Sequence, residues 1–95
     1  MLTIPTRTML RASDDIKKSL YSAMNSKKYS VEYVSKLSNQ IWALNELEDR
    51  LLTSREAPLT VLEKFAYKLK VYSANEEEFS DCVAILDVLY DMVIC

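Results

Sequence analysis

The chain has 95 residues, and none of them is glycine. Tight β-hairpin turns depend on glycine or on an Asn-Gly pair at positive φ, so a chain without glycine has few ways to connect neighbouring strands. Proline, the other common turn residue, occurs only at Pro5 and Pro58. The missing glycines therefore argue against an all-β fold and favour helices joined by polar loops.

The length of the chain limits it to one domain. A chain of this size can support a single hydrophobic core. Its hydrophobic share of 49% and charged share of 27% are typical of a folded protein and unlike the composition of disordered segments. We therefore expect one helical domain over residues 1–95.

Apolar residues recur at intervals of three and four, which is the period of an amphipathic helix. Four segments with this period predict helices over about 8–25, 31–53, 60–73 and 76–94. The first helix has two competing start signals, an early one at Pro5 and a late one at Ser13. We expect an all-α bundle in up-down-up-down order, with an irregular helical array as the alternative.

Polar residues mark the other helix starts. Ser30 is a suitable N-cap for the second helix. Thr60 and Glu63 have the spacing of a capping box, and Asn75 and Glu78 repeat that spacing before the fourth helix. These signals predict that the third and fourth helices begin near residues 60 and 76.

The fourth helix is unusually apolar. Its apolar residues cover about 200° of the helical circumference, about twice the arc that a surface helix buries. This pattern indicates either the central helix of the bundle or an interface with a second copy or another protein. In a homo-oligomer, we expect Ile85, Leu89 and Met92 to form the self-association surface.

The only tryptophan lies off the buried stripe of its helix. In a helical projection, Trp42 points well away from Leu44 and Leu47. Tyr67 and Val71 lie off the apolar stripe of the third helix in the same way. Because tryptophan is enriched among interface anchors, we expect these three side chains to form one partner-binding patch. The alternatives are that Trp42 packs beneath the loop between the first two helices and that Tyr67 and Val71 are ordinary exposed apolar residues.

Charge is distributed unevenly along the chain. Residues 1–36 carry seven basic and three acidic side chains, whereas residues from 75 onward carry six acidic side chains and no basic one. This asymmetry favours either packing of the first helix beside the last or head-to-tail attraction between copies. Asp81, Asp87 and Asp91 form an acidic arc that would steer the chain toward a basic partner surface. A pI near 5.1 makes nucleic acid an unlikely partner.

Glu48 interrupts the leucine stripe of the second helix. If its carboxylate is buried, it needs a basic partner such as Arg11 or Arg50. Alternatively, Glu48 marks the point where the stripe drifts and the helix leaves the core.

The sequence offers little for catalysis or for holding a metal. It has no histidine and no glycine-rich phosphate loop, and Cys82 lies on an apolar face without a neighbouring base. The spacing of Cys82 and Cys95 is not that of metal ligands. The sequence contains no apolar run of signal-peptide or membrane-spanning length. We therefore expect a cytoplasmic protein that does not associate with membranes. We expect it to contain neither a metal nor a cofactor.

One short pattern suggests an enzyme. Glu46 and Asp49 on the second helix, with Glu78 and Asp81 at the start of the fourth, resemble the paired ExxE and ExxD motifs of the all-α MazG-type nucleotide pyrophosphohydrolases. The resemblance implies that these acids hold magnesium against a nucleoside triphosphate. It covers about eight residues, and an aspartate replaces the last glutamate of the first motif.

Taken together, these features favour binding over turnover. We expect a small cytoplasmic regulator or inhibitor that docks a helical face on a larger protein. Compact acidic helical proteins of phages and other mobile elements are similar in size and composition. The alternatives are a homo-oligomer that assembles through the fourth helix and a MazG-like pyrophosphohydrolase.

Overall fold

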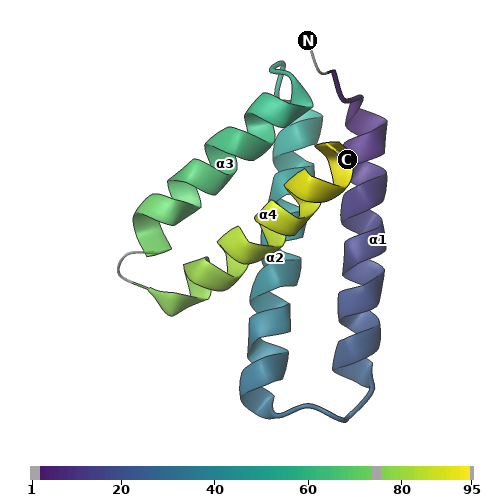
Figure 1. Ribbon diagram of the computed structural model, residues 1–95, viewed down its shortest axis with the longest axis vertical. Coiled ribbons are helices and arrows are strands. Elements are labelled where there is room, and N and C mark those ends of the chain that lie inside the picture. The colour runs from purple at the N-terminus through teal and green to yellow at the C-terminus, as the bar shows by residue number, and fades with distance from the viewer. Residues whose placement is uncertain (1–2, 74–75, 95) are drawn as a thin grey trace.

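Four α-helices form two antiparallel hairpins. The computed structural model describes residues 3–73 and 76–94, and its helices are α1 (Thr6–Asn25), α2 (Val31–Thr53), α3 (Pro58–Ser73) and α4 (Glu77–Ile94). Successive helices alternate in direction, and the α3–α4 hairpin is inclined to the α1–α2 hairpin, so that α4 crosses over α2 (Figure 1). The predicted all-α bundle of four helices is confirmed.

The first helix uses the earlier of its two start signals. Pro5 is the N-cap of α1, and its carbonyl accepts hydrogen bonds from the amides of Thr8 and Met9 at 3.1 and 3.2 Å. Ser13 lies inside the helix and is fully buried, so the later start is wrong. Proline suits the beginning of a helix because its fixed φ and its missing N–H cost nothing there.

The second helix begins where the sequence predicts. Ser30 has an extended backbone, and its hydroxyl accepts a hydrogen bond from the amide of Tyr33 at 3.2 Å. Because this contact satisfies one of the orphan amides of the first turn, Ser30 is a functioning N-cap.

The third helix begins earlier than its capping box predicts. Pro58 is its first residue, and the Ala57 carbonyl accepts from the amide of Val61 at 3.0 Å. Thr60 is therefore inside α3 and does not cap it. The preference of proline for the first helical position outweighs the capping-box spacing. Asn75, predicted to cap α4, lies outside the described residues.

The fourth helix lies at the centre of the bundle together with α2, because each of these two helices packs against the other three. This position explains its wide apolar arc. Ile85 is 6% exposed and Leu89 is 0% exposed, so both belong to the core of one chain. Their predicted place on a surface between copies is corrected accordingly. The other helices supply the rest of the core, chiefly Met9, Leu44, Leu47, Leu62, Phe65 and Leu69.

A polar cluster joins α1 to α2 inside the bundle. Glu48 Oε2 accepts a hydrogen bond from Ser13 Oγ at 2.7 Å and lies 2.8 Å from Lys17 Nζ. Lys17 also donates to Asn45 Oδ1 at 2.9 Å. The carboxylate of Glu48 therefore has partners, but they are Ser13 and Lys17 instead of the expected arginines. The cluster fixes the register of α1 on α2, because sliding either helix would separate all of these groups.

Candidate interaction surface

Trp42 is exposed on α2, as its position off the leucine stripe predicts. Its side chain is 48% exposed, whereas Leu44 and Leu47 are 0% exposed. The difference arises because α1, α3 and α4 cover the leucine face of α2, while Trp42 lies at the edge of this covered face. A half-exposed tryptophan leaves a large apolar area available for a partner.

An apolar hollow of about 190 Å³ lies beside Trp42, between α2 and α3. Leu69 and Phe65 line its inner wall, and both are only 3% exposed. Tyr72 and Phe79 line it near the α3–α4 turn, with their ring centroids 5.8 Å apart. Three partly exposed aromatic side chains from three different helices therefore converge on one hollow.

Two further hollows extend this surface along α2. Trp42 and Phe79 also line a hollow of about 270 Å³, which reaches Asn39. At the other end, a hollow of about 240 Å³ shares Phe65 and reaches Thr53. Since adjoining hollows share walls, we treat all three as one surface, the tryptophan groove, which follows α2 from Asn39 to Thr53.

The far end of the tryptophan groove is basic. The guanidinium carbon of Arg50 lies 4.6 Å from the centroid of the Phe65 ring, a cation–π contact. Arg50 Nε also lies 3.3 Å from Glu46 Oε1. Lys68 is exposed on the groove wall and has no ion-pair partner among the described residues. Lys64 and Glu56 also line this end and form an ion pair at 2.6 Å. The carboxylates of Glu46 and Glu56 therefore offset two of the three positive charges, and Lys68 is left to attract an anionic group.

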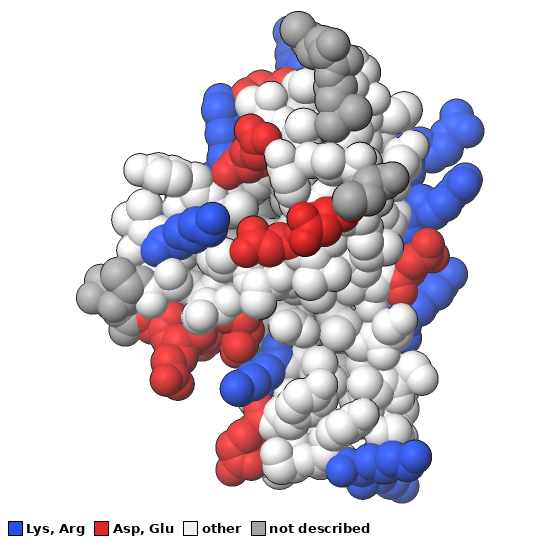
Figure 2. All heavy atoms as spheres, in the orientation of Figure 1, with Lys and Arg blue, Asp and Glu red and all other residues white. Residues whose placement is uncertain are grey.

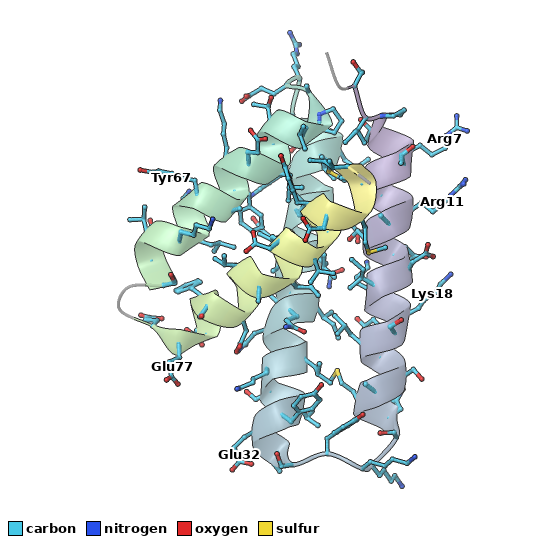
Figure 3. The ribbon with its side chains drawn as sticks, viewed as in Figure 1. Arg7, Arg11, Lys18, Glu32, Tyr67 and Glu77 are labelled. Atoms are coloured by element: carbon cyan, nitrogen blue, oxygen red, sulfur yellow. The ribbon has the colours of Figure 1, made fainter. Side chains whose placement is uncertain are left out.

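Tyr67 and Val71 do not join Trp42 in one patch. Both are exposed, at 70% and 56%. Tyr67 projects away from α3 (Figure 3) and lines a separate hollow of about 370 Å³ between α3 and α4. The expectation of a single patch is therefore corrected: the face of α3 that meets Trp42 carries Lys68 and Tyr72 instead.

The three acidic residues assigned to one arc of α4 face two directions. Asp81 is partly buried, and Asn39 Nδ2 donates to its carboxylate at 3.5 Å. Asp87 and Asp91 are exposed, and Asp87 lines the hollow that contains Tyr67. Figure 2 shows acidic side chains in a row along α4. Asp81 thus belongs to the contact with α2, and of the three only Asp87 and Asp91 form an exposed acidic surface.

Apart from Lys17, which pairs with Glu48, the basic side chains of α1 point away from the bundle. Arg7, Arg11 and Lys18 project from its outer side (Figure 3). Although α1 packs against α4, no ion pair connects these two helices within residues 3–73 and 76–94. The uneven charge of the chain therefore appears on its surface as a basic edge along α1 and an acidic face on α4.

Of the three residues predicted for self-association, Met92 is the one left on the surface. It is 48% exposed, and Val88, one turn earlier, is 47% exposed. Val88 and Met92 are thus the most exposed large apolar side chains of α4, whereas Ile85 and Leu89 face the core of their own chain.

Cys82 is not placed for nucleophilic chemistry. The side chain is 2% exposed, and its Sγ donates to the Asn39 carbonyl at 3.3 Å. Burial, with a smaller effect from the charges of Asp81 and Glu78, raises the pKa of the thiol to about 11. A thiol with this pKa is protonated at neutral pH and is a weak nucleophile.

The four carboxylates that resemble a MazG-type motif are not gathered around a common point. Glu46 pairs with Arg50, and Asp81 accepts from Asn39. Among the described residues, no group of three or more histidine, cysteine or acidic side chains is arranged to hold a metal ion.

Sequence reasoning missed the aromatic partners of Trp42. Tyr72 and Phe79 lie on apolar stripes, where they resemble ordinary core residues. The available signal was their position, because both flank the short connection between α3 and α4. Aromatic residues on either side of a tight interhelical connection meet at the end of the hairpin, where the core is thin.

Comparison with known proteins adds no relative. No family model matches the chain, and neither the curated protein sequences nor the solved structures show a significant match to it. Among the helices that the structure describes, none has both the length and the apolar character needed to cross a membrane. The proposals below accordingly depend on the surface of this chain.

Proposed function

We propose that this protein is a protein-binding module that regulates or inhibits a larger cytoplasmic protein, and that the tryptophan groove is its principal binding surface. The observation that carries the proposal is the convergence of Trp42, Tyr72 and Phe79 on an apolar hollow. Trp42 and Tyr72 are 48% and 51% exposed. A monomeric protein gains little from leaving large aromatic side chains half in water, whereas a binding protein uses them as anchors.

The groove has the features that concentrate binding energy. Aromatic side chains bring a large apolar area and lose little rotamer entropy when a partner covers them. Phe65 and Leu69 beneath them are part of the packed core, so the floor of the groove is rigid. Arg50 and Lys68 at one end supply directional polar contacts that favour one pose of the partner.

The acidic surface of α4 has a separate part in the proposal. Asp87 and Asp91 would raise the association rate with a partner that carries a basic surface, because complementary charge steers diffusional encounter. Their effect is expected to weaken with salt, whereas apolar contacts in the tryptophan groove are not screened. Salt dependence therefore separates the contributions of the two surfaces.

The decisive experiment is capture of a binding partner from a lysate of the source organism with matched variants. Trp42→Ala removes the anchor, and Tyr67→Ala removes an exposed aromatic side chain outside the groove. We expect wild type and Tyr67→Ala to hold the same partner, and Trp42→Ala to bind it about 30-fold more weakly or worse, the loss typical of an interface hot spot.

A photo-crosslinking amino acid at position 42, compared with one at position 67, tests the location directly. Covalent adducts are expected from position 42. If Trp42→Ala retains the partner as well as wild type does, or if no partner is held by any form, the groove is not the binding surface and the proposal is wrong.

A further inference from the structure

The shape and charge of the tryptophan groove define what kind of segment it can bind. The α2 residues that line it are Asn39, Trp42, Glu46, Arg50 and Thr53, in steps of three and four. At about 1.5 Å per residue, this face is about 20 Å long. The opposite wall is α3 in the two hollows that Phe65 lines, and α4 in the hollow that reaches Asn39.

A groove between packed helices is a surface on which a further helix packs. Its side chains fill the hollows between the helical ridges, and a stripe at i, i+3 or i+4, and i+7 matches the period of the groove. About four helical turns span its length. The middle hollow, lined by aromatic residues and leucine, would take the apolar stripe of such a helix.

The two ends of the groove carry opposite charge. Lys68 and Arg50 lie toward the end that is near the start of α3, and Glu78 lines the hollow at the other end. A hydrogen bond with Glu76 and repulsion between the two carboxylates raise the pKa of Glu78, which indicates local excess of negative charge. A helix carries partial positive charge at its N-terminus and partial negative charge at its C-terminus. The favoured orientation therefore places its N-terminus at Glu78 and its C-terminus at Lys68.

We propose that the tryptophan groove binds an amphipathic α-helix of about four turns from a partner protein, parallel to α2, with acidic side chains in its last turn and basic ones in its first. This inference depends on the proposed function, because it names the partner segment for the same groove. The apolar stripe of the helix would cover Trp42, and its terminal acids would meet Lys68.

Synthetic peptides of about 15 residues with one leucine stripe test the proposal. The forward peptide has lysines in its first turn and glutamates in its last, the reversed peptide has the same composition in the opposite charge order, and a third is the forward peptide with a central proline. The reversed peptide is the better isolated helix, because its charges suit its own dipole. Tighter binding of the forward peptide therefore cannot come from its intrinsic helicity.

Binding is followed by the emission of the single tryptophan and by the anisotropy of labelled peptide. We expect the forward peptide to shift the emission to shorter wavelength and to bind at least about fivefold more tightly than the reversed peptide at low salt. The preference should disappear in about 0.5 M salt, and the proline peptide should not bind. Lys68→Glu leaves negative charge at both ends and should abolish the preference, whereas Lys18→Glu, on the outer side of α1, should leave it unchanged.

Equal binding of the forward and reversed peptides, tight binding of the proline peptide, or binding of no peptide would overturn the helix proposal. Any of these results combined with Trp42-dependent capture of a natural partner would leave the proposed function standing. A change in the molar mass of the chain on Trp42→Ala, measured by light scattering, would show that a second copy occupies the groove, which also overturns the proposal.

Discussion

The polar cluster between α1 and α2 allows a quantitative test of what holds the first hairpin in place. Glu48→Ala removes the acceptor of two close contacts, Ser13 Oγ at 2.7 Å and Lys17 Nζ at 2.8 Å. Ser13 is 0% exposed, so its hydroxyl would lose its partner without gaining water. Lys17 would keep Asn45 as an acceptor at 2.9 Å, but its charge would no longer be balanced nearby.

The expected cost follows from the burial of these groups. Breaking a fully buried ion pair costs about 3–5 kcal/mol. The side chains of Lys17 and Glu48 are 15% and 23% exposed, so solvent screens part of their interaction. We therefore expect Glu48→Ala to lower the free energy of unfolding by about 2–3 kcal/mol. A domain of this size has about 5–14 kcal/mol in total, so the loss corresponds to about 10–20 °C in Tm.

Two controls isolate the electrostatic part of the stability lost in Glu48→Ala. Replacing Ser13, Lys17 and Glu48 together by Ala, Met and Leu removes every charge and donor, so the triple variant should be more stable than Glu48→Ala alone. Lys18→Met breaks the ion pair of Lys18 with Asp14, whose side chains are 75% and 53% exposed, and should cost less than about 0.5 kcal/mol. Urea unfolding followed by circular dichroism measures all three. A cost for Glu48→Ala no larger than that for Lys18→Met, or a triple variant less stable than the single one, would refute the reasoning.

Three further predictions concern Cys82, α4 and the N-cap of α2. In a Cys95→Ser background, the Cys82 thiol should react with an alkylating reagent at pH 8 about 100-fold more slowly than an unperturbed thiol. The reason is that its pKa of about 11, compared with an ordinary value of 9.0, leaves correspondingly less thiolate. Reaction in the native protein at the rate seen in urea would contradict this. As the pH rises, the thiol loses its proton in the unfolded chain before it does so in the folded protein. The contribution of Cys82 to stability should therefore be present below pH 9 and decline by up to about 2–3 kcal/mol toward pH 11. The Cys82→Ala variant should lack this decline. Leu89→Ala should destabilise the fold by about 2–5 kcal/mol and Met92→Ala by less than about 0.5 kcal/mol, as measured by calorimetry. If the two variants lost similar amounts of stability, Met92 would be buried by a second copy. Ser30→Ala should cost about 1 kcal/mol in urea unfolding, and an unchanged midpoint would show that the cap is not needed.

The sequence predicted the helices well because their signals are local. The period of the apolar residues located four helices, and the hydroxyl of Ser30 marked the start of α2. The errors occurred where two local signals compete. Pro58 and Thr60 both favour a helix start, and the structure shows that proline takes the first position. A two-residue error of this kind leaves the buried face of α3 unchanged, because the face depends on the period and not on the first residue.

The interaction surface was only partly predictable. Trp42 could be placed off the leucine stripe from its angle alone, but its neighbours depend on how α3 and α4 approach α2. Tyr67 and Val71 share the outward direction of Trp42 without sharing its groove, whereas Tyr72 and Phe79 reach it from stripes that resemble core. No periodicity within one helix can tell which side of a neighbouring helix it will face.

The lack of glycine and the apolar period by themselves determined an all-α bundle of four helices, because both depend only on covalent geometry and on residues a few positions apart. The tertiary structure decided whether the apolar arc of α4 is buried in the core or exposed. It also decided which basic residue forms an ion pair with Glu48 and which aromatic side chains share a hollow with Trp42. These outcomes depend on how the helices cross and pack, which brings together residues 30 or more positions apart in the sequence. The crossing is set by how the side chains of all four helices fill one core, a property of the whole chain that no short segment encodes.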